Sequence, residues 1–476
     1  MKADLERYIS TARWFGGKGR EHHVTAVRRA GRLSASAPAD HPQPCVGIEL
    51  VTVEYPSHGE HEVYQVPLAY YGEEQERLEH AYVGSWEDAD LGTVHAYDAL
   101  HDRAATSLWL EAFVEERADD ELRFHRLPGH ELDLTVHSTL FSGEQSNSSV
   151  AFGEDSLMKV FRKVTPGGNP DIEIHEALTR AESEHVAALY GWVEAPGSAG
   201  EPPMQLAMLQ EFLRTASDGW DLALASVRDL YAEADLHADE VGGDFGSESH
   251  RLGVATGQVH DALASAFPTT EWGRDDLRAL ADAMRARLDA AVEVVPELAP
   301  HADALRTIYA AVEQITDTVL VQRVHGDFHL GQTLRTTRGW KIVDFEGEPA
   351  KPLADRVLPD SPWRDVAGML RSLDYAAHAV EADVEVDEEG RKQIAYRAAE
   401  WAQRNQEEFL DGYVEVSGRT ASGVISPEQR LLLAAYQADK AVYETVYEAR
   451  NRPSWITIPL GAIARLAESA RQEEES

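Results

Sequence analysis

The sequence predicts an α+β fold in which a small α+β domain precedes a β-rich lobe and then a mainly helical lobe. Three observations support this prediction: alternating apolar segments before residue 131, short strand-like segments over 131–213, and helical spacing of apolar residues over most of 214–476. We therefore expect domains at residues 1–130, 131–213 and 214–476. A chain of 476 residues is long enough for three domains.

The first domain is expected to combine strands with a helix. Residues 47–55, GIELVTVEY, and 63–71, VYQVPLAYY, are rich in β-branched and aromatic residues, which favour strands. Residues 105–116, ATSLWLEAFVEE, have the apolar spacing of a helix. Together these segments predict a small, separate α+β domain.

The second domain begins with an expected strand, a polar loop and a hairpin. The strand LDLTVHSTLF leads into the loop SGEQSNSS, residues 142–149, and the tight turn GEDS joins SVAF to LMKVF. Asn169 and Pro170 then predict the start of a helix, because Asn is a preferred N-cap residue and Pro suits the first helical position. PMQLAMLQEFL, residues 203–213, is the last expected strand.

The third domain is predicted to be helical with one short β-hairpin. Apolar residues recur at helical spacing in segments such as RALADAMRARLDAAVEVV and RDVAGMLRSLDYAAHAV. Residues 324–349, VHGDFHLGQTLRTTRGWKIVDFEGEP, interrupt them with two short apolar strands. The acidic segments 238–249 and 381–390 are expected to be solvated loops.

The chain is strongly acidic. It holds 83 Asp and Glu residues against 44 Lys and Arg residues, which gives a formal net charge of −39 at pH 7. This charge opposes nucleic-acid binding, which needs a basic face, and it costs stability through self-repulsion that salt screens. Our hypothesis is adaptation to high salt, and the alternative is an acidic but ordinary mesophilic protein.

Cysteine usage and hydropathy bear on location. The single cysteine, Cys45, rules out an intramolecular disulfide framework and favours a reducing cytoplasm. The N-terminal residues lack the continuous apolar core of a signal peptide, and the longest apolar runs are too short to cross a bilayer. We therefore expect a soluble cytoplasmic protein without membrane or nucleic-acid partners.

Residues 324–349 give the clearest chemical signal. Asp327 is followed five residues later by Gln332 and, after the predicted hairpin, by Asp344. Phosphoryl transfer needs a carboxylate that orients the attacking hydroxyl and hard oxygen ligands that hold Mg²⁺. The kinase catalytic loop has the same Asp-to-amide spacing. We therefore predict a bilobal protein-kinase-like fold with Asp327 as the catalytic residue and Gln332 and Asp344 as metal ligands. Taken singly, each of these residues could be a turn or capping residue.

A nucleotide-binding lysine is predicted in the β-rich lobe. Lys159 lies in the apolar strand LMKVF and needs an anion, which the phosphates of ATP would supply. An outward-pointing lysine on an edge strand is the alternative. Glu173 is predicted to be its ion-pair partner, although Asp171 and Glu176 are neighbours and any Glu here could serve the helix dipole.

Two further segments are assigned to the nucleotide. Three polar residues of the loop after the first strand could cradle phosphate, with a plain hairpin loop as the alternative: Ser146, Asn147 and Ser148. The backbone near Gln210 and Phe212, at the end of the last strand, is predicted by position to contact the adenine.

An acceptor sugar is predicted to bind a helix near the end of the chain. Its face would combine charged groups with an aromatic ring, as a sugar site requires: Lys440, Tyr443, Glu444 and Glu448. A buried aromatic stripe with a salt bridge between Lys440 and Glu444 is the alternative. Asp365 and Arg371 could line the same cleft, although Asp365 could instead brace the catalytic loop.

Several of these segments resemble the actinobacterial-type maltokinases. HGDFHLGQ, DFEGEP, RDVAGMLRSLDYAA and DKAVYETVYEARNRPSWITIPL carry the resemblance, and TARWFGGKGR resembles the start of their N-terminal cap domain. The resemblance implies an aminoglycoside-phosphotransferase-type fold with an added cap. It also implies ATP- and Mg²⁺-dependent phosphorylation of maltose to maltose 1-phosphate for glycogen and α-glucan synthesis, and association with a trehalose synthase.

The same resemblance assigns roles to single residues. It implies that Asp327 orients or deprotonates the hydroxyl, that Gln332 and Asp344 bind the metal, and that Lys159 binds phosphate. His325 and His329 would support the catalytic loop, with His329 facing the cleft.

Two other functions stay open. Relatives with the same scaffold phosphorylate glucosamine, and a sugar pocket is retuned by few side chains. For that alternative acceptor, Glu444 or Glu448 would accept the amine. A catalytically inactive nucleotide-binding regulator is the remote alternative.

Overall fold

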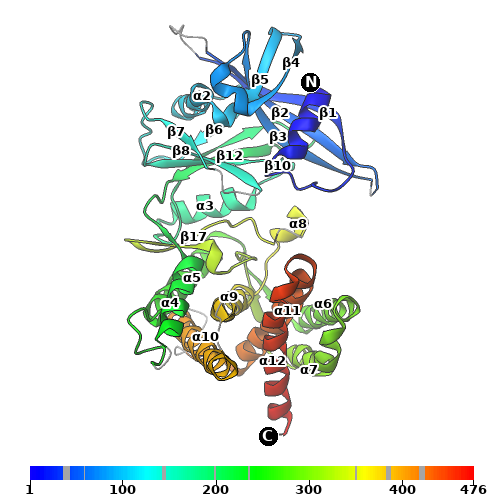
Figure 1. The fold of residues 1–476 in the computed structure, drawn as a ribbon, viewed down its shortest axis with the longest axis vertical. Coiled ribbons are helices and arrows are strands. Elements are labelled where there is room, and N and C mark those ends of the chain that lie inside the picture. Colours follow the sequence, from blue (N-terminus) through cyan, green and yellow to red (C-terminus); the bar gives the residue numbers. More distant parts are fainter. Residues whose placement is uncertain are drawn as a thin grey trace. The chain divides into compact units, whose positions relative to one another are not determined.

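The computed structural model describes residues 1–475 except 36–42, 58, 142–145, 198–199, 234–235, 349–350, 382–386 and 418–423. The chain divides into two compact units. The first comprises Met1–Glu176 and Ala187–Arg214, and the second comprises Ala177–Val186 and Thr215–Ser476. Strands dominate the first unit and helices dominate the second (Figure 1).

One sheet of the first unit is built almost entirely from the N-terminal part of the chain. It has six strands in the order β1-β2-β3-β5-β4, with β10 paired to β3: β1 (His23–Leu33), β2 (Cys45–Tyr55), β3 (Glu60–Tyr71), β4 (Tyr82–Asp88), β5 (Gly92–Asp98) and β10 (Lys163–Val164). The helices of this part are α1 (Lys2–Thr11), η1 (Glu76–Ala81), η2 (Ala99–His101) and α2 (Arg103–Val114). The strands and the helix predicted for this part are confirmed.

The other sheet of the first unit is antiparallel. Its six strands follow the order β6-β11-β12-β9-β8-β7: β6 (Arg123–Arg126), β7 (Ser138–Leu140), β8 (Asn147–Phe152), β9 (Ser156–Phe161), β11 (Leu189–Ala195) and β12 (Met204–Glu211). The helix α3 (Pro170–Arg180) begins where the sequence predicts, because Asn169 Oδ1 accepts a hydrogen bond from Asp171 N at 2.8 Å.

The two sheets share one hydrophobic core. Ile48 and Trp109 from the N-terminal part lie in the same buried cluster as Val150, Met158 and Leu206 from the second sheet. The two segments predicted as separate domains, 1–130 and 131–213, therefore bury their apolar side chains together.

The second unit is mainly a helical bundle and also contains two small antiparallel sheets, β13-β16-β17 and β14-β15. Its helices are α4 (Gly219–Ala232), α5 (Gly246–Ala266), α6 (Arg274–Val294), η3 (Pro296–His301), α7 (Ala302–Val312), η4 (Leu330–Gln332), α8 (Leu353–Arg356), α9 (Trp363–Glu381), α10 (Glu388–Val416), α11 (Pro427–Asn451), η6 (Pro453–Trp455) and α12 (Thr457–Glu475). Its strands are β13 (Ser217–Asp218), β14 (Thr270–Trp272), β15 (Val319–Val321), β16 (Thr333–Thr336) and β17 (Gly339–Ile342).

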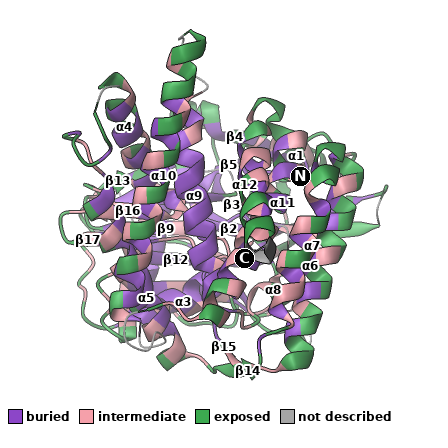
Figure 2. Cartoon of the chain, turned by 90° about the horizontal axis from the view of Figure 1, so that it is seen from below, coloured by how far each residue is buried: buried purple, intermediate pink, exposed green. Residues whose placement is uncertain are grey.

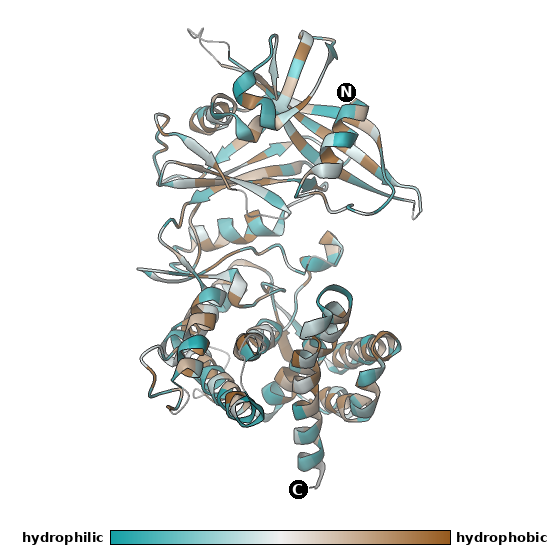
Figure 3. Ribbon diagram, in the orientation of Figure 1, coloured by the Kyte–Doolittle hydropathy of each residue, from teal (hydrophilic) through white to brown (hydrophobic). Residues whose placement is uncertain are grey.

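The helix α9 lies at the centre of this bundle. It is buried along most of its length (Figure 2), and it packs against α4, α10 and α11. The surrounding helices carry hydrophilic residues beside hydrophobic ones (Figure 3), as expected for amphipathic helices that face solvent on one side. No helix among the described residues is long and apolar enough to cross a membrane.

One predicted loop is more buried than its acidity suggests. In the segment 238–249, Val241 and Phe245 are buried, and the Phe245 ring stacks on Trp401 of α10 with 5.9 Å between centroids. The expectation of a solvated loop is wrong here, because these two apolar side chains anchor the segment to the bundle. In the other acidic segment, 382–386 lie outside the described residues.

The net charge of −39 leads to a prediction about salt. Raising KCl from about 0.1 M to about 2 M should shorten the screening length and weaken the self-repulsion of the folded chain. We expect the midpoint of thermal unfolding to rise by at least about 4 °C, which corresponds to about 1–2 kcal/mol for a unit of 150–250 residues. Differential scanning fluorimetry would measure this. A constant midpoint, or an equal rise in sucrose of the same osmolality, would contradict the charge explanation.

Candidate functional site

The β16–β17 hairpin brings the two predicted metal ligands together. Thr333 pairs with Ile342, so the strands open toward Gln332 on one side and Asp344 on the other. Gln332 Nε2 lies 3.4 Å from Asp344 Oδ2 and donates a hydrogen bond to it. Asp344 has a φ of +66°, a left-handed conformation that Asp tolerates better than most residues. The hairpin therefore places one amide and one carboxylate at the same point.

These two side chains fit a magnesium ion. Mg²⁺ prefers oxygen ligands, and proteins usually supply one or two carboxylates while phosphate groups and water complete the shell. The Asp344 carboxylate meets this need directly. The Gln332 side chain can also supply an oxygen ligand if its amide is rotated so that the oxygen, rather than the nitrogen, faces Asp344. The oxygen and nitrogen of such an amide are assigned from hydrogen bonds.

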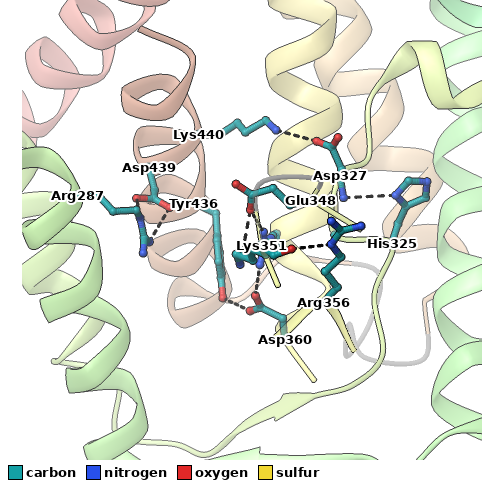
Figure 4. A network of polar contacts seen from close by, with 12 residues as sticks. Arg287, His325, Asp327, Glu348, Lys351, Arg356, Asp360, Tyr436, Asp439 and Lys440 are labelled. Atoms are coloured by element: carbon teal, nitrogen blue, oxygen red, sulfur yellow. Dashed lines mark hydrogen bonds and ion pairs between the residues drawn. The ribbon is translucent and has the colours of Figure 1, made fainter. Parts of the chain in front are cut away.

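Asp327 is paired with a lysine from a distant helix. Lys440 of α11 donates a hydrogen bond from Nζ to Asp327 Oδ1 at 3.1 Å (Figure 4). Burial alone would raise the pKa of the Asp327 carboxyl, but the positive charge of Lys440 is the foremost influence that holds it below its usual value. Asp327 is therefore a carboxylate at neutral pH, as a hydroxyl-orienting group must be.

Two histidines fix the catalytic loop. His325 Nε2 donates to the carbonyl of Val343 at 3.0 Å, and its Nδ1 accepts from the Asp327 amide at 3.4 Å, an assignment that follows from these partners. His329 Nδ1 accepts from the Gly331 amide at 3.1 Å. Burial lowers the pKa of His329, so its ring is neutral and Nε2 carries the proton. His325 thus ties the segment with Asp327 to the segment that leads to Asp344.

The Asp365 side chain holds this loop in place through hydrogen bonds. Its Oδ2 accepts from the His325 amide at 2.7 Å and its Oδ1 accepts from the Gly326 amide at 2.8 Å, while His260 Nε2 lies 3.1 Å from Oδ2. The side chain is 1% exposed. The predicted contact of Asp365 with the substrate is therefore wrong, because both of its oxygens serve the loop, and the alternative role as a brace is confirmed.

Arg371 is also a structural residue. Its Nη1 donates to Asp374 Oδ2 at 2.7 Å, and its Nε and Nη2 both donate to Glu444 Oε2, at 3.0 and 2.8 Å. Because Arg371 is 4% exposed and its guanidinium is held between Asp374 and Glu444, the predicted contact with substrate is wrong. Its ion pairs instead join α9 to α11. Burial raises the pKa of Glu444, although the charge of Arg371 opposes this shift.

The Glu448 carboxylate is also held in ion pairs and hydrogen bonds within the protein. Arg452 donates to both of its oxygens, from Nε at 2.9 Å and from Nη2 at 2.6 Å, and Tyr375 donates at 3.3 Å. Glu448 is 1% exposed and paired with Arg452, so it is closed to an acceptor sugar and that prediction is wrong as well. A bidentate arginine pair of this kind is a strong, directional interaction.

Two tyrosines of α11 are open to solvent. The Lys440 ammonium lies 5.2 Å from the Tyr443 ring centroid, and the Tyr443 and Tyr447 rings stack with centroids 6.4 Å apart. Tyr443 is 38% exposed and Tyr447 is 43% exposed. The alternative of a buried aromatic stripe is therefore wrong, and the predicted sugar contact of Tyr443 remains a prediction.

In the first unit, Lys159 forms an ion pair with an aspartate. Its Nζ donates to Asp171 Oδ2 at 2.8 Å. Burial alone would raise the pKa of Asp171, but the charges of Lys159 and His175 hold it well below its usual value. Asp171, which was only a neighbour in the sequence prediction, is thus an ion-pair partner of Lys159. The pairing of Lys159 with Glu173 remains a prediction.

Strand pairing sorts the predicted phosphate-binding residues by face. Ser149 lies opposite Lys159, and Asn147 opposite Phe161, so both share the face of Lys159. Ser148 belongs to the other face, where its Oγ accepts from Arg162 Nε at 2.8 Å. A phosphate contact of the Ser148 hydroxyl is therefore wrong. Ser149 takes its place as a candidate that the sequence analysis missed, because only the pairing of β8 with β9 shows which face Ser149 occupies.

The remaining loop and hinge residues are partly described. Residues 142–145 of the predicted phosphate loop lie outside the described residues, and Ser146 is exposed. The Phe212 amide donates to the carbonyl of Asp155 at 2.9 Å. The Phe212 amide is therefore occupied within the protein, and the adenine contacts assigned to the backbone near Gln210 and Phe212 remain predictions.

The chain is similar to several characterised proteins. Residues 8–102 match the model of the maltokinase N-terminal cap domain. Glucosamine kinase from Streptacidiphilus jiangxiensis is 31% identical over 325 residues, covering 66% of this chain and 70% of that protein. Glucosamine kinase from Mycolicibacterium smegmatis is 28% identical over 338 residues, covering 68% and 78%.

A solved structure shares the fold over the full length. A glucosamine kinase in complex with glucosamine, ADP and inorganic phosphate matches with a TM-score of 0.67 and 23% identity, over 98% of this chain and 100% of that chain. The fold is thus that of a kinase-like α+β phosphotransferase with an N-terminal cap, which confirms the predicted fold class. The chain belongs to the sugar kinase family that includes the glucosamine kinase of Streptacidiphilus jiangxiensis, and its residues 8–102 form the N-terminal cap domain.

Proposed function

We propose that the protein is an ATP- and Mg²⁺-dependent sugar kinase that phosphorylates a sugar hydroxyl at Asp327. One observation carries this proposal. A carboxylate held ionised by Lys440 lies in the loop directly before a hairpin that ends in Gln332 and Asp344. Phosphoryl transfer requires this combination of a hydroxyl-orienting carboxylate and oxygen ligands for a metal.

Each residue has a distinct task in the proposed reaction. Asp327 accepts a hydrogen bond from the acceptor hydroxyl and takes its proton as the new oxygen–phosphorus bond forms and the bond to the ADP leaving group breaks. Lys440 keeps Asp327 ionised and adds positive charge where the transferred group is most negative. Gln332 and Asp344 would hold Mg²⁺, which neutralises phosphate charge when bound. Lys159 would bind the phosphates of ATP.

The side chains of α11 favour a neutral glucoside such as maltose as the acceptor. Glu448 is fully paired with Arg452, and one oxygen of Glu444 is held by Arg371. Tyr443 lies beside Lys440, and Tyr447 stacks on Tyr443. Their exposed rings could stack against the apolar faces of two linked sugar rings. If maltose 1-phosphate is the product, an enzyme that forms maltose, such as a trehalose synthase, is the expected functional partner.

Glucosamine is the second candidate, and different observations favour it. Both named relatives are glucosamine kinases. Among the described contacts of Glu444, Arg371 uses only Oε2, so Oε1 can accept an ammonium group. Glu444 also lies one helical turn from Lys440 and hence near Asp327.

A panel of acceptors decides between these functions. The purified protein is incubated with ATP, Mg²⁺ and, separately, maltose, glucose, glucosamine and N-acetylglucosamine, and NMR locates the phosphate on any product. We expect phosphate on the anomeric oxygen of maltose. Phosphate on C6 of glucosamine would replace maltose by the second candidate. ATP binding without transfer to any sugar would contradict the kinase proposal and favour a regulator.

A further inference from the structure

A buried ion pair joins the cap to the strands that carry the predicted phosphate-binding groups. We infer that Arg162, together with Asp98 and Ser148, positions β8 and β9 for nucleotide binding, so that the cap sets the affinity for ATP. This inference rests on the proposed function. It gives the cap a task within the nucleotide site, and Arg162 acts as a positioning residue. We call the set Tyr8, Asp98, Ser148 and Arg162 the cap linkage.

The cap linkage is tightly bonded and closed to solvent. Arg162 Nη2 donates to Asp98 Oδ2 at 3.0 Å, and Arg162 Nε donates to Ser148 Oγ at 2.8 Å. Tyr8 also donates to Asp98 Oδ2, and the Arg162 guanidinium lies 4.7 Å from the Trp14 ring centroid. Arg162 and Asp98 are 2% and 1% exposed.

The linkage connects two parts of the first unit. Tyr8, Trp14 and Asp98 belong to residues 8–102, the segment that matches the cap model. Arg162 stands between β9 of the second sheet and β10, which pairs with β3 of the cap sheet. Its carbonyl accepts from the amide of Gln65 at 2.7 Å. The chain thus passes from one sheet to the other at Arg162.

A second cap residue strengthens this junction. Gln65 Nε2 donates to the carbonyl of Phe161 at 2.8 Å and to the carbonyl of Leu206 at 2.9 Å. Gln65 is fully buried on β3. The cap therefore holds the backbone at the end of β9 and in the middle of β12, in addition to the side chain of Arg162.

The position of Ser148 connects the linkage to the nucleotide site. Ser148 lies between Asn147 and Ser149, and Ser149 is opposite Lys159. Because neighbouring side chains of a strand point to opposite faces, Arg162 and Lys159 lie on opposite sides of the sheet. Arg162 is thus placed to act on the nucleotide only through the position of β8 and β9.

Stability alone is a poor explanation for this pair. Two buried charges are costly to desolvate, and apolar residues of similar volume often serve a core equally well. Arg162 Nη1 has no hydrogen-bond partner among the described residues, which adds to that cost. A directional bond from a fixed guanidinium to one hydroxyl of β8 is what positioning of that strand requires.

The variant Ser148→Ala tests the inference with little disturbance of the fold. It removes one hydroxyl that accepts a hydrogen bond from a charged donor, so we expect the KM for ATP and the dissociation constant of ATP to rise by about tenfold. The KM for the sugar and kcat should change by less than about twofold, since the second unit is untouched. Ser148→Thr keeps the hydroxyl and should restore the affinity for ATP.

Thr106→Val is the matched control. Thr106 Oγ1 lies 2.6 Å from Ser138 Oγ, so this variant also removes a buried hydroxyl from a contact between a cap-side helix and the second sheet. It should lower the unfolding temperature as much as Ser148→Ala while leaving ATP affinity unchanged. Equal changes of ATP affinity in both variants, or no change in either, would overturn the inference. Calorimetric titration with ATP gives this answer even if the sugar kinase activity itself is absent.

Discussion

Replacing Asp327 with asparagine is expected to reduce kcat by about 10²–10⁴-fold, the usual contribution of a positioned general base. Asparagine keeps the size of the side chain but cannot accept the proton of the acceptor hydroxyl. Binding of ATP should change by less than about threefold, because the proposed phosphate ligand Lys159 belongs to another part of the chain. A coupled assay for ADP measures the first quantity, and calorimetric titration with ATP measures the second.

Asp355→Asn is a matched control for this prediction. Asp355 lines a cavity of about 340 Å³ beside the catalytic loop, together with Gly326, Glu348 and Lys351. The control removes the same charge from the same neighbourhood without touching Asp327, and it should retain at least half of the wild-type kcat. Turnover that survives in Asp327→Asn would show that another group orients the hydroxyl. Equal losses in both variants would point to a general effect of charge.

The proximity of the proposed core residues could be predicted from the sequence because those residues are local. Asp327, Gln332 and Asp344 lie within one short segment, and a hairpin of fixed register brings the last two together. Lys440 was predicted only as a sugar-binding residue, since one helical face groups it with Tyr443. Its contact with Asp327, however, joins residues 113 positions apart and is seen only in the fold.

The errors have one physical origin. Asp365 and Arg371 have the chemistry of substrate ligands, but α9 is central in the bundle and buries both. Charged residues that are fully buried must be paired, and here their partners are backbone amides of the catalytic loop and the carboxylates of α9 and α11. A pattern of residue types cannot distinguish a buried, paired carboxylate from one that awaits a ligand.

A pattern of residue types was equally insufficient for the predicted nucleotide-binding residues. The segment Ser146–Ser148 was chosen as a polar loop, whereas β8 already begins at Asn147 and alternates between two faces. Only the pairing with β9 shows that Ser148 turns toward Arg162 and that Ser149 faces the side of Lys159. The burial of Arg162 against Asp98 depends on contacts between residues 64 positions apart, which no local pattern reveals.

The second large effect is expected for Lys440→Met. We expect kcat/KM at neutral pH to fall by about 10²-fold, comparable with the loss of one preorganised charge-stabilising group. The pH profile should change as well. Burial alone would raise the pKa of Asp327, and the positive charge of Lys440 is the foremost influence that lowers it below its usual value. Without Lys440 that pKa rises, so the pH below which activity is lost should move upward.

The direction of this shift separates the electrostatic role of Lys440 from a purely structural one. The wild-type enzyme needs Asp327 ionised, so its activity falls only as the pH drops through a pKa that Lys440 has depressed. Lys440→Arg keeps the positive charge and should keep the acid limb of kcat/KM in place, even if its larger head group lowers the rate. Lys351→Met removes a cation that lines the neighbouring cavity and should leave the acid limb unchanged. An acid limb that stays fixed in Lys440→Met, despite a lower rate, would mean that Lys440 contributes packing or sugar contacts without controlling the ionisation of Asp327.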